Sequence, residues 1–259
     1  MNTTLNINRL GLLLKRYFIE NKQRELTFWG ITIVVFTLMH LAGAQEKSIS
    51  VEMFLYISGF IFAARTFKIF NHTPGGMHYL LIPATHFEKL TTAILLSTFY
   101  YFVMILITYS LGTILGTTIG NFFFESNNPI VFALFQSNPD FLVNGRTIHN
   151  AGPSLLNTFI SFAGIQAVFM LGSIYFKGNA VGKTFLSITA TAIVLGIIEL
   201  LLLRITFGTY HIEGQMMNIT IDSEHGLLSL LGTVNKVFAY ALIPFFWVVS
   251  YFRLKEKQV

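Results

Sequence analysis

The chain has 259 residues, of which 53% are hydrophobic, 15% aromatic and 11% charged, and it contains no cysteine. Soluble globular domains carry about 25% charged residues, so the low charge excludes an ordinary soluble domain, and the 27 phenylalanines exclude a disordered chain. The absence of cysteine also excludes disulfide scaffolds and zinc–thiolate sites. The net charge of +5 is scattered between long apolar runs, so we expect no nucleic-acid partner. A polytopic membrane protein is the class that fits.

Residues 1–25 are predicted to form an amphipathic helix that lies along the membrane surface. Read at helical spacing, one side carries apolar and aromatic residues and the other side carries the basic ones; the apolar side consists of Leu10, Leu13, Leu14, Tyr17 and Phe18. No small-residue cleavage site follows the short apolar stretch, so we do not interpret it as a secretory signal. A frayed, charged tail is the alternative reading of the same residues.

Six later stretches are apolar enough to be membrane spans, because about 20 helical residues cross a hydrocarbon core of about 30 Å. They are residues 26–44, 49–67, 91–119, 155–176, 185–203 and 234–252. The third stretch is longer than one crossing needs, so we expect it to tilt or to emerge from the membrane. The predicted fold is an all-α polytopic membrane protein with one six-helix transmembrane domain, residues 26–252, and a short tail, residues 253–259.

The orientation follows from the distribution of lysine and arginine, which accumulate in cytoplasmic segments. With the N-terminus inside, 13 of the 17 lysines and arginines fall on the cytoplasmic side and 4 fall outside. We therefore expect both termini and the inner loops 68–90 and 177–184 to be cytoplasmic. The outer segments are then 45–48, 120–154 and 204–233.

The segment GNAVGKT, which starts at Gly178, invites comparison with a phosphate-binding P-loop. A P-loop needs four residues between its first glycine and the Gly-Lys-Ser/Thr that follows. Only three residues separate Gly178 from Gly182, and Lys177 occupies the position of the missing glycine. We therefore expect no intrinsic ATP hydrolysis, and we interpret Lys177 and Lys183 as anchors on an interhelical turn.

Other catalytic or ligand-binding patterns are also missing from the sequence. His72, His78 and His86 share the first inner loop, but their spacing does not place pairs on one helical face as metal ligation would require. The chain has neither an HExxH helix nor a GxSxG nucleophile turn. We therefore predict no catalytic residue, no metal and no cofactor in this chain.

Two features inside the spans carry structural expectations. Glu199 is the only ionisable residue that lies well within a span, and a single carboxylate at that depth is a poor basis for a proton relay. Gly112, Gly116 and Gly120 repeat every four residues and form a small-residue stripe that lets another helix backbone approach closely. The stripe fits packing within one chain and a dimer interface equally well.

The first inner loop reads FNHTPGGMHYLLIPATHFEKL from Phe70 to Leu90. A Pro-Gly-Gly turn precedes a short apolar stretch that ends at Pro83. Thr85 then stands in an N-cap position with Glu88 three residues later, which predicts a capping box at the start of the third span. An element of this kind, continuous with two spans, can receive force from a partner; an ordinary interfacial loop would account for the same residues.

Within this loop, YLLIPATHFEKL resembles the inner-loop signature of bacterial ABC-2 type permeases, especially those of the Bacteroidetes. YFKGNAVGKT, from Tyr175 to Thr184, is similar to the stretch that those proteins carry between their fourth and fifth spans. The matching positions are Leu81, Pro83, Ala84, Glu88 and Lys89, followed by Phe176, Lys177, Ala180, Lys183 and Thr184.

The resemblance implies the membrane subunit of an ABC-type exporter in the bacterial inner membrane, surrounded by lipid. It implies a dimer, with itself or with a second membrane subunit, and a separate ABC ATPase subunit that docks on the first cytoplasmic loop. The docking residues would be Met77, Tyr79, Leu80, Leu81, Pro83, Glu88 and Lys89. Residues 205–233 are more polar than the re-entrant helices that such permeases have there, and the 120–154 segment is longer, so no substrate is predicted.

Two other classes of function remain open at this point. A non-transporting membrane scaffold or sensor-associated subunit would share the same span pattern. An intramembrane enzyme is opposed by the missing nucleophile and metal motifs.

Overall fold

The computed structural model describes residues 6–42, 48–67, 81–124, 130, 132, 141–143, 146–148, 155–176, 178–207 and 225–256. Its helices are α1 (Ile7–Leu41), α2 (Ser48–Arg65), α4 (His86–Ile94), the π-helical turn η3 (Leu95–Tyr100), α5 (Tyr101–Phe124), α6 (Leu155–Tyr175), α7 (Ala180–Phe207) and α8 (His225–Glu256). Two short antiparallel strands, β1 (Phe141–Val143) and β2 (Arg146–Ile148), pair with Leu142 opposite Thr147.

Four of the described helical stretches are long and apolar enough to cross a membrane. They are α1, the continuous helix from His86 to Phe123, α6, and the first part of α7 up to Glu199. The predicted helical, membrane-type architecture is confirmed by these four stretches. The β1–β2 hairpin, which falls in the long segment 120–154, was not predicted.

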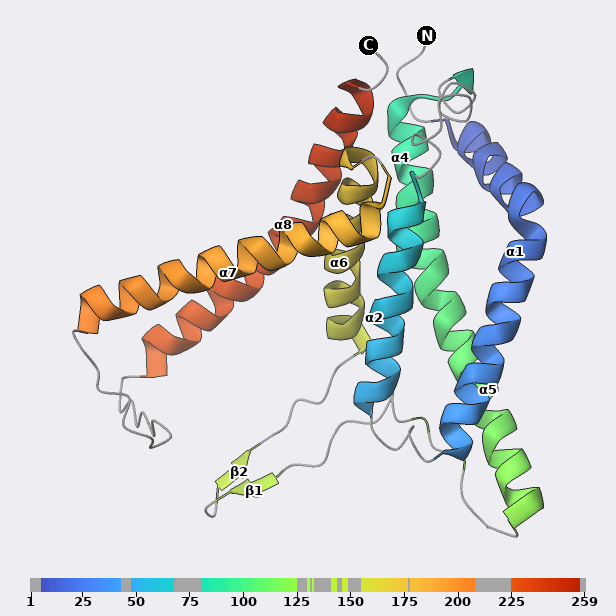
Figure 1. Ribbon diagram of the computed structural model, residues 1–259, viewed down its shortest axis with the longest axis horizontal. Coiled ribbons are helices and arrows are strands. Elements are labelled where there is room, and N and C mark those ends of the chain that lie inside the picture. Colours follow the sequence, from blue (N-terminus) through green and yellow to red (C-terminus); the bar gives the residue numbers. More distant parts are fainter. Residues whose placement is uncertain are drawn as a thin grey trace.

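The helices are arranged so that the start of α1 and the end of α8 lie near the start of α4, at one end of the molecule (Figure 1). The β1–β2 hairpin lies at the opposite end. Helices α1, α2, α5 and α6 run side by side between these ends, whereas α7 leaves the bundle sideways (Figure 1). Among the α7 side chains that the structure describes, the buried ones, Ala180 and Thr184, belong to its first two turns.

Helix α1 joins two segments that the sequence analysis treated separately. The described parts of the expected surface helix, residues 1–25, and of the expected first span, residues 26–44, belong to one uninterrupted helix of 35 residues, Ile7–Leu41. Asn6 caps its start, because the Asn6 side chain accepts a hydrogen bond from the backbone N–H of Asn8 at 3.0 Å. A continuous helix mechanically couples the charged first half of α1 to its apolar second half.

The predicted third span, residues 91–119, is likewise part of a single rod made of α4, η3 and α5. Its start is the predicted capping box: the Thr85 side chain accepts from the Glu88 backbone, and the Glu88 side chain accepts from the Thr85 backbone. The π-helical turn η3 lies inside the rod and ends at Tyr100, and Tyr101 begins α5. Tyr100 contacts α1, while Tyr101 stacks on Phe162 of α6, with ring centroids 5.9 Å apart.

An aromatic core holds α1, α2, α5 and α6 together. Its buried members include Trp29 and Phe36 of α1, Leu55 of α2, Tyr101 and Tyr109 of α5, and Phe162 of α6. A second cluster packs the start of α4 against α6 and the end of α8; it comprises Phe67, Leu90, Ala93, Met170, Ile174 and Leu254. The start of α4 is therefore anchored on several helices at once.

The last two helices are longer than the sequence predicted. Helix α7 extends from Ala180 to Phe207 rather than over residues 185–203, and α8 begins at His225 rather than at residue 234. The start of α8 lies in the polar 204–233 segment, where hydropathy alone does not signal a helix. Pro244 stands inside α8, where its ring removes one backbone hydrogen bond.

Candidate functional site

The Glu88 carboxylate joins the start of α1 to the start of α4. Its Oε1 accepts a hydrogen bond from the backbone N–H of Asn6 at 2.8 Å and lies 3.2 Å from Nη2 of Arg9. Its Oε2 accepts from the backbone N–H of Thr85 at 2.8 Å. The carboxylate is thus a helix cap for α4 and a tether for α1, and its side chain is 0% exposed.

The surroundings of Glu88 favour the charged carboxylate. Burial by itself would raise the pKa of Glu88, but the N–H groups of Thr85 and Asn6 and the guanidinium of Arg9 outweigh burial and lower the pKa below its ordinary value. Glu88 precedes the apolar stretch that begins at Thr91, so this charge lies at the end of the rod. Removing Arg9 from this pair is costly, because the fully buried Glu88 carboxylate loses its charged partner.

The predicted docking residues divide into two groups where the structure describes them. Leu81 is 78% exposed and Pro83 is exposed as well, so both are available to a partner. Glu88 and Lys89 are buried within the chain, so their side chains do not offer a contact surface to a partner. Met77, Tyr79 and Leu80 lie outside the described residues.

Residues 178–184 build the start of α7. Gly178 has a φ of 85°, a left-handed conformation that favours glycine. Asn179 then caps the helix, because its Oδ1 accepts from the backbone N–H of Gly182 at 3.2 Å. The segment follows helix α6 and not a strand, so it has the geometry of an interhelical turn. Lys183 is exposed on α7, and Lys177 lies outside the described residues.

The glycine stripe packs inside the chain, between α5 and α1. A Cβ atom at Gly112 would lie 2.5 Å from Cβ of Phe36, and one at Gly116 would lie 2.8 Å from Cβ of His40. A Cβ at Gly120 would make an ordinary contact, 3.6 Å from Leu41. The first two glycines are therefore required by the close approach of α1, which leaves that face of α5 occupied.

Glu199 lies on α7 and is exposed. Most of the described α7 surface around it is apolar and exposed too, including Ile193, Leu195 and Ile198. The structure thus places Glu199 away from the Glu88 site and outside the core.

Sequence reasoning missed the partners of Glu88 and a second buried carboxylate. Asn6 and Arg9 are in the N-terminal segment, and nothing local pairs them with a residue in the first inner loop. Glu25, which we assigned to an interfacial helix, is 6% exposed and accepts hydrogen bonds from Tyr17 at 2.7 Å and from Trp29 at 3.0 Å. The aromatic donors on the same helix, one of them four residues away, were the available signal.

No model of a known protein family matches the chain, and neither a curated protein nor a solved structure matches it.

Proposed function

We propose that this chain is the membrane-spanning permease subunit of an ABC-type exporter in a bacterial inner membrane, energised by a separate ATPase subunit that docks on the first cytoplasmic loop. The observation that carries the proposal is the junction at Glu88. There, the exposed end of the loop adjoins the start of α4, which is held by the several hydrogen bonds of the buried Glu88 carboxylate. The loop and turn motifs that resemble ABC-2 permeases lie on both sides of this junction and at the start of α7.

The described end of the loop has the properties of a contact surface. Leu81 and Pro83 are exposed, so a partner that covers them would bury apolar surface, which favours binding. Directly behind them, Ala84 is buried and Thr85 begins the capping box. A force that a partner applies to Leu81 is therefore transmitted to the start of α4, because only a few residues separate them.

The helices behind the junction can pass this push into the membrane. The rod from His86 to Phe123 is continuous, and Glu88 also holds Asn6 and Arg9 at the start of α1. Helix α1 also contacts α5 closely at Gly112 and Gly116. Helix α1 and the rod are therefore joined both at Glu88 and at the glycine stripe, so a displacement of the loop would tilt the two together.

The rest of the proposal concerns topology and assembly. We place six spans in the membrane by adding α2 and α8 to the four apolar helices, with both chain ends in the cytoplasm, as the lysine and arginine distribution favours. A dimer of membrane subunits belongs to the same proposal, and the exposed apolar length of α7 is available for it. The chain needs no cofactor of its own in this arrangement.

The test is purification of the full-length, affinity-tagged chain from its native membranes in a mild detergent, followed by assay of ATP hydrolysis. We expect an ATPase subunit with a complete P-loop to co-purify and the complex to hydrolyse ATP. Replacing the P-loop lysine of that ATPase should abolish hydrolysis without dissociating the complex. A chain that purifies without any ATPase, or with a partner that lacks a P-loop, would instead support the membrane scaffold.

A further inference from the structure

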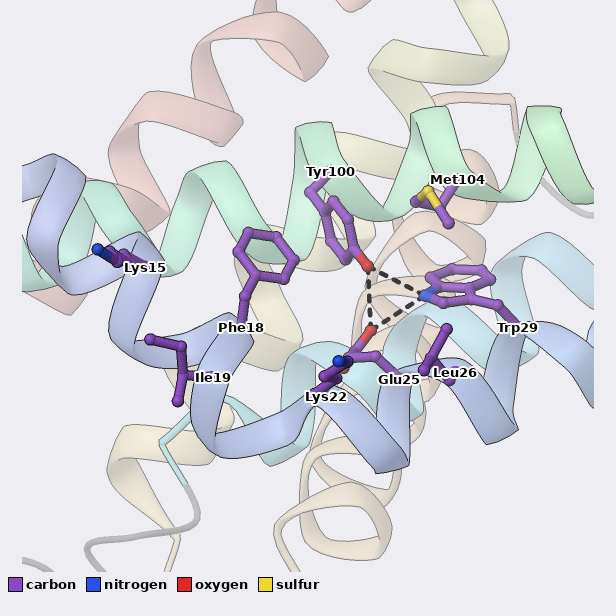
Figure 2. A pocket seen from close by; sticks show the side chains of 9 residues that line it. All are labelled: Lys15, Phe18, Ile19, Lys22, Glu25, Leu26, Trp29, Tyr100 and Met104. Atoms are coloured by element: carbon purple, nitrogen blue, oxygen red, sulfur yellow. Dashed lines mark hydrogen bonds between the residues drawn. The ribbon is translucent and has the colours of Figure 1, made fainter.

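A groove of about 540 Å³ runs between the first half of α1 and the rod formed by η3 and α5 (Figure 2). Its volume lies within the range of small-molecule sites, about 300–1,000 Å³. One face of α1 supplies most of the lining, and Tyr100 and Met104 supply the opposite wall. The glycine stripe, which brings α1 and α5 together, is farther along both helices, so the groove lies between that contact and the junction at Glu88.

The floor of the groove is polar and internally bonded. Nε1 of Trp29 donates to Oε2 of Glu25 at 3.0 Å and to the hydroxyl oxygen of Tyr100 at 3.1 Å, and the Tyr100 hydroxyl lies 3.2 Å from the same carboxylate oxygen (Figure 2). The other carboxylate oxygen accepts from Tyr17 at 2.7 Å. These three side chains fill acceptor positions of the Glu25 carboxylate, so its oxygens are already engaged before a ligand binds.

The rim of the groove is positively charged. Lys15 and Lys22 line it and are separated by two helical turns, on the same face of α1. Both side chains are exposed, and neither is in a salt bridge with a residue that the structure describes. By contrast, Arg16 on the neighbouring face is paired with Glu20 at 2.6 Å. The two groove lysines are therefore the cations that are free to meet an anionic ligand.

The walls of the groove next to the lysines are apolar. Phe18, Ile19 and Leu26 of α1 and Met104 of α5 line this part, and the first three are exposed. The ring of Phe18 packs edge-on against Tyr100, with centroids 5.1 Å apart. Trp29, Tyr100 and Tyr17 gather at this level of α1, and such amphipathic rings are typical of the membrane–water boundary.

We infer that this groove binds one anionic glycerophospholipid from the leaflet on the side of the chain ends, with its phosphate at Lys15 and Lys22 and an acyl chain against Ile19, Leu26 and Met104. The inference does not depend on the proposed function. It rests on the coincidence of a cationic rim, an apolar wall and a position where α1 passes from its charged half to its apolar half. Anionic leaflets attract basic residues at this level.

The charge of the groove selects between possible occupants. A cationic amphiphile would have to approach two unpaired ammonium groups in order to reach a carboxylate that already accepts from three side chains. Free phosphate would satisfy the lysines but would leave the apolar wall uncovered. An anionic lipid satisfies both parts of the groove.

The test uses Trp29 as a built-in reporter, because the chain has only two tryptophans. Trp247→Phe leaves Trp29 alone. The full-length Trp247→Phe protein is reconstituted in phosphatidylcholine vesicles that contain a small fraction of brominated phosphatidylglycerol or, in a parallel sample, brominated phosphatidylcholine. We expect the anionic quencher to act on Trp29 at a several-fold lower mole fraction than the zwitterionic one.

Substitutions then locate the effect. Lys15→Gln and Lys22→Gln should each weaken the preference for the anionic quencher about fivefold, whereas Arg16→Gln, which removes one positive charge from the adjacent face, should leave it unchanged. Lys15→Arg and Lys22→Arg should retain it. Circular dichroism and monodispersity in detergent report whether each variant is folded.

The inference would be overturned by equal quenching of Trp29 by the two lipids in the Trp247→Phe protein, or by an effect of Arg16→Gln as large as that of Lys15→Gln. Relief of quenching by millimolar inorganic phosphate would also overturn it and would indicate a site for the free anion. So would relief of quenching by a cationic detergent at concentrations where an anionic detergent has no effect.

Discussion

Nη2 of Arg9, in the first turns of α1, lies 3.2 Å from Oε1 of Glu88, in the first turn of α4. The pair connects the N-terminal helix to the element that follows the loop 68–90, and it does so at a carboxylate that also caps α4. The starts of α1 and α4 therefore share one buried anchor. This arrangement fixes the end of the loop, at Thr85, on both helices.

Glu88→Ala should destabilise the protein by about 2 kcal/mol or more, because it removes half of a capping box and leaves Arg9 without its carboxylate. The measurement is the thermal unfolding midpoint of the full chain in detergent. Glu20→Ala is the matched control: it breaks the exposed Arg16–Glu20 pair and should cost less than about 1 kcal/mol. Equal shifts for the two variants would contradict the anchoring role of Glu88.

The contribution of Glu88 to the stability of the folded protein should decrease as the pH is lowered. Its pKa in the folded protein is below the ordinary value of 4.5, so the stabilisation is fully present above about pH 4.5 and is lost as the pH falls through the folded pKa. The difference in unfolding midpoint between the wild type and Glu88→Gln should therefore be constant from pH 7 to pH 5 and should shrink at lower pH. A difference in unfolding midpoint that grows on acidification would contradict a lowered pKa of Glu88 in the folded protein.

Gly112→Ala should destabilise the protein by about 1–3 kcal/mol, because the added methyl group would lie 2.5 Å from Cβ of Phe36 and would push α1 away from α5. Two glycines of the same chain serve as controls. Gly120→Ala would make an ordinary 3.6 Å contact, and Gly196→Ala on α7 has no neighbour within 4 Å. Both should be neutral or slightly stabilising, since alanine favours a helix over glycine.

If all three glycine variants unfold at the wild-type temperature while Gly112→Ala alone changes the oligomeric state, the stripe serves a dimer and not the α1–α5 contact. The unfolding midpoint and the elution volume in size-exclusion chromatography separate these outcomes.

Topology can be tested by single-cysteine labelling, since the chain has no native cysteine. We expect Thr147→Cys, in β2, to react in intact cells with a membrane-impermeant maleimide, and Lys183→Cys, at the start of α7, to react only after the cells are opened. The physical basis is the excess of lysine and arginine on one side. Labelling of Lys183→Cys from outside would reverse the orientation.

The sequence was informative wherever the signal is local. The capping box at Thr85 and Glu88 was predictable because its two residues lie three apart, and the glycine stripe predicted a close helix approach because its spacing matches one helical face. The structure has the capping box, and α1 approaches the stripe closely at Gly112 and Gly116 but not at Gly120. The contact partners of these two features were not predictable. Arg9 pairs with Glu88, and α1 packs against the glycine stripe, only because the tertiary fold brings distant segments together.

The burial of the Glu25 carboxylate was the main feature that could not be predicted from the sequence. Glu25 belongs to a segment with several basic residues, and that pattern favours a solvated interfacial helix. Its carboxylate is buried because Tyr17 and Trp29 of the same helix and Tyr100 of the rod all donate to it. The continuity of α1 follows from an uninterrupted helical sequence, yet the change from charged to apolar residues at Leu26 suggested two separate segments.

The most direct test of the central claim is to measure how strongly loop variants of the full chain bind the proposed partner ATPase. Leu81→Asp places a charge on an exposed residue of the proposed docking loop and should weaken binding about thirtyfold, equivalent to about 2 kcal/mol, with the fold unchanged. Ile7→Asp is the matched control, because Ile7 and Leu81 are both 78% exposed and Ile7 is on α1.

Binding of the purified ATPase to the tagged chain is measured by titration, with monodispersity and unfolding midpoint as controls for folding. The account predicts that Leu81→Asp loses recruitment and that Ile7→Asp and Lys183→Glu retain it. Wild-type recruitment by a folded Leu81→Asp protein, together with loss of recruitment by Lys183→Glu, would contradict it and would assign docking to the turn that precedes α7.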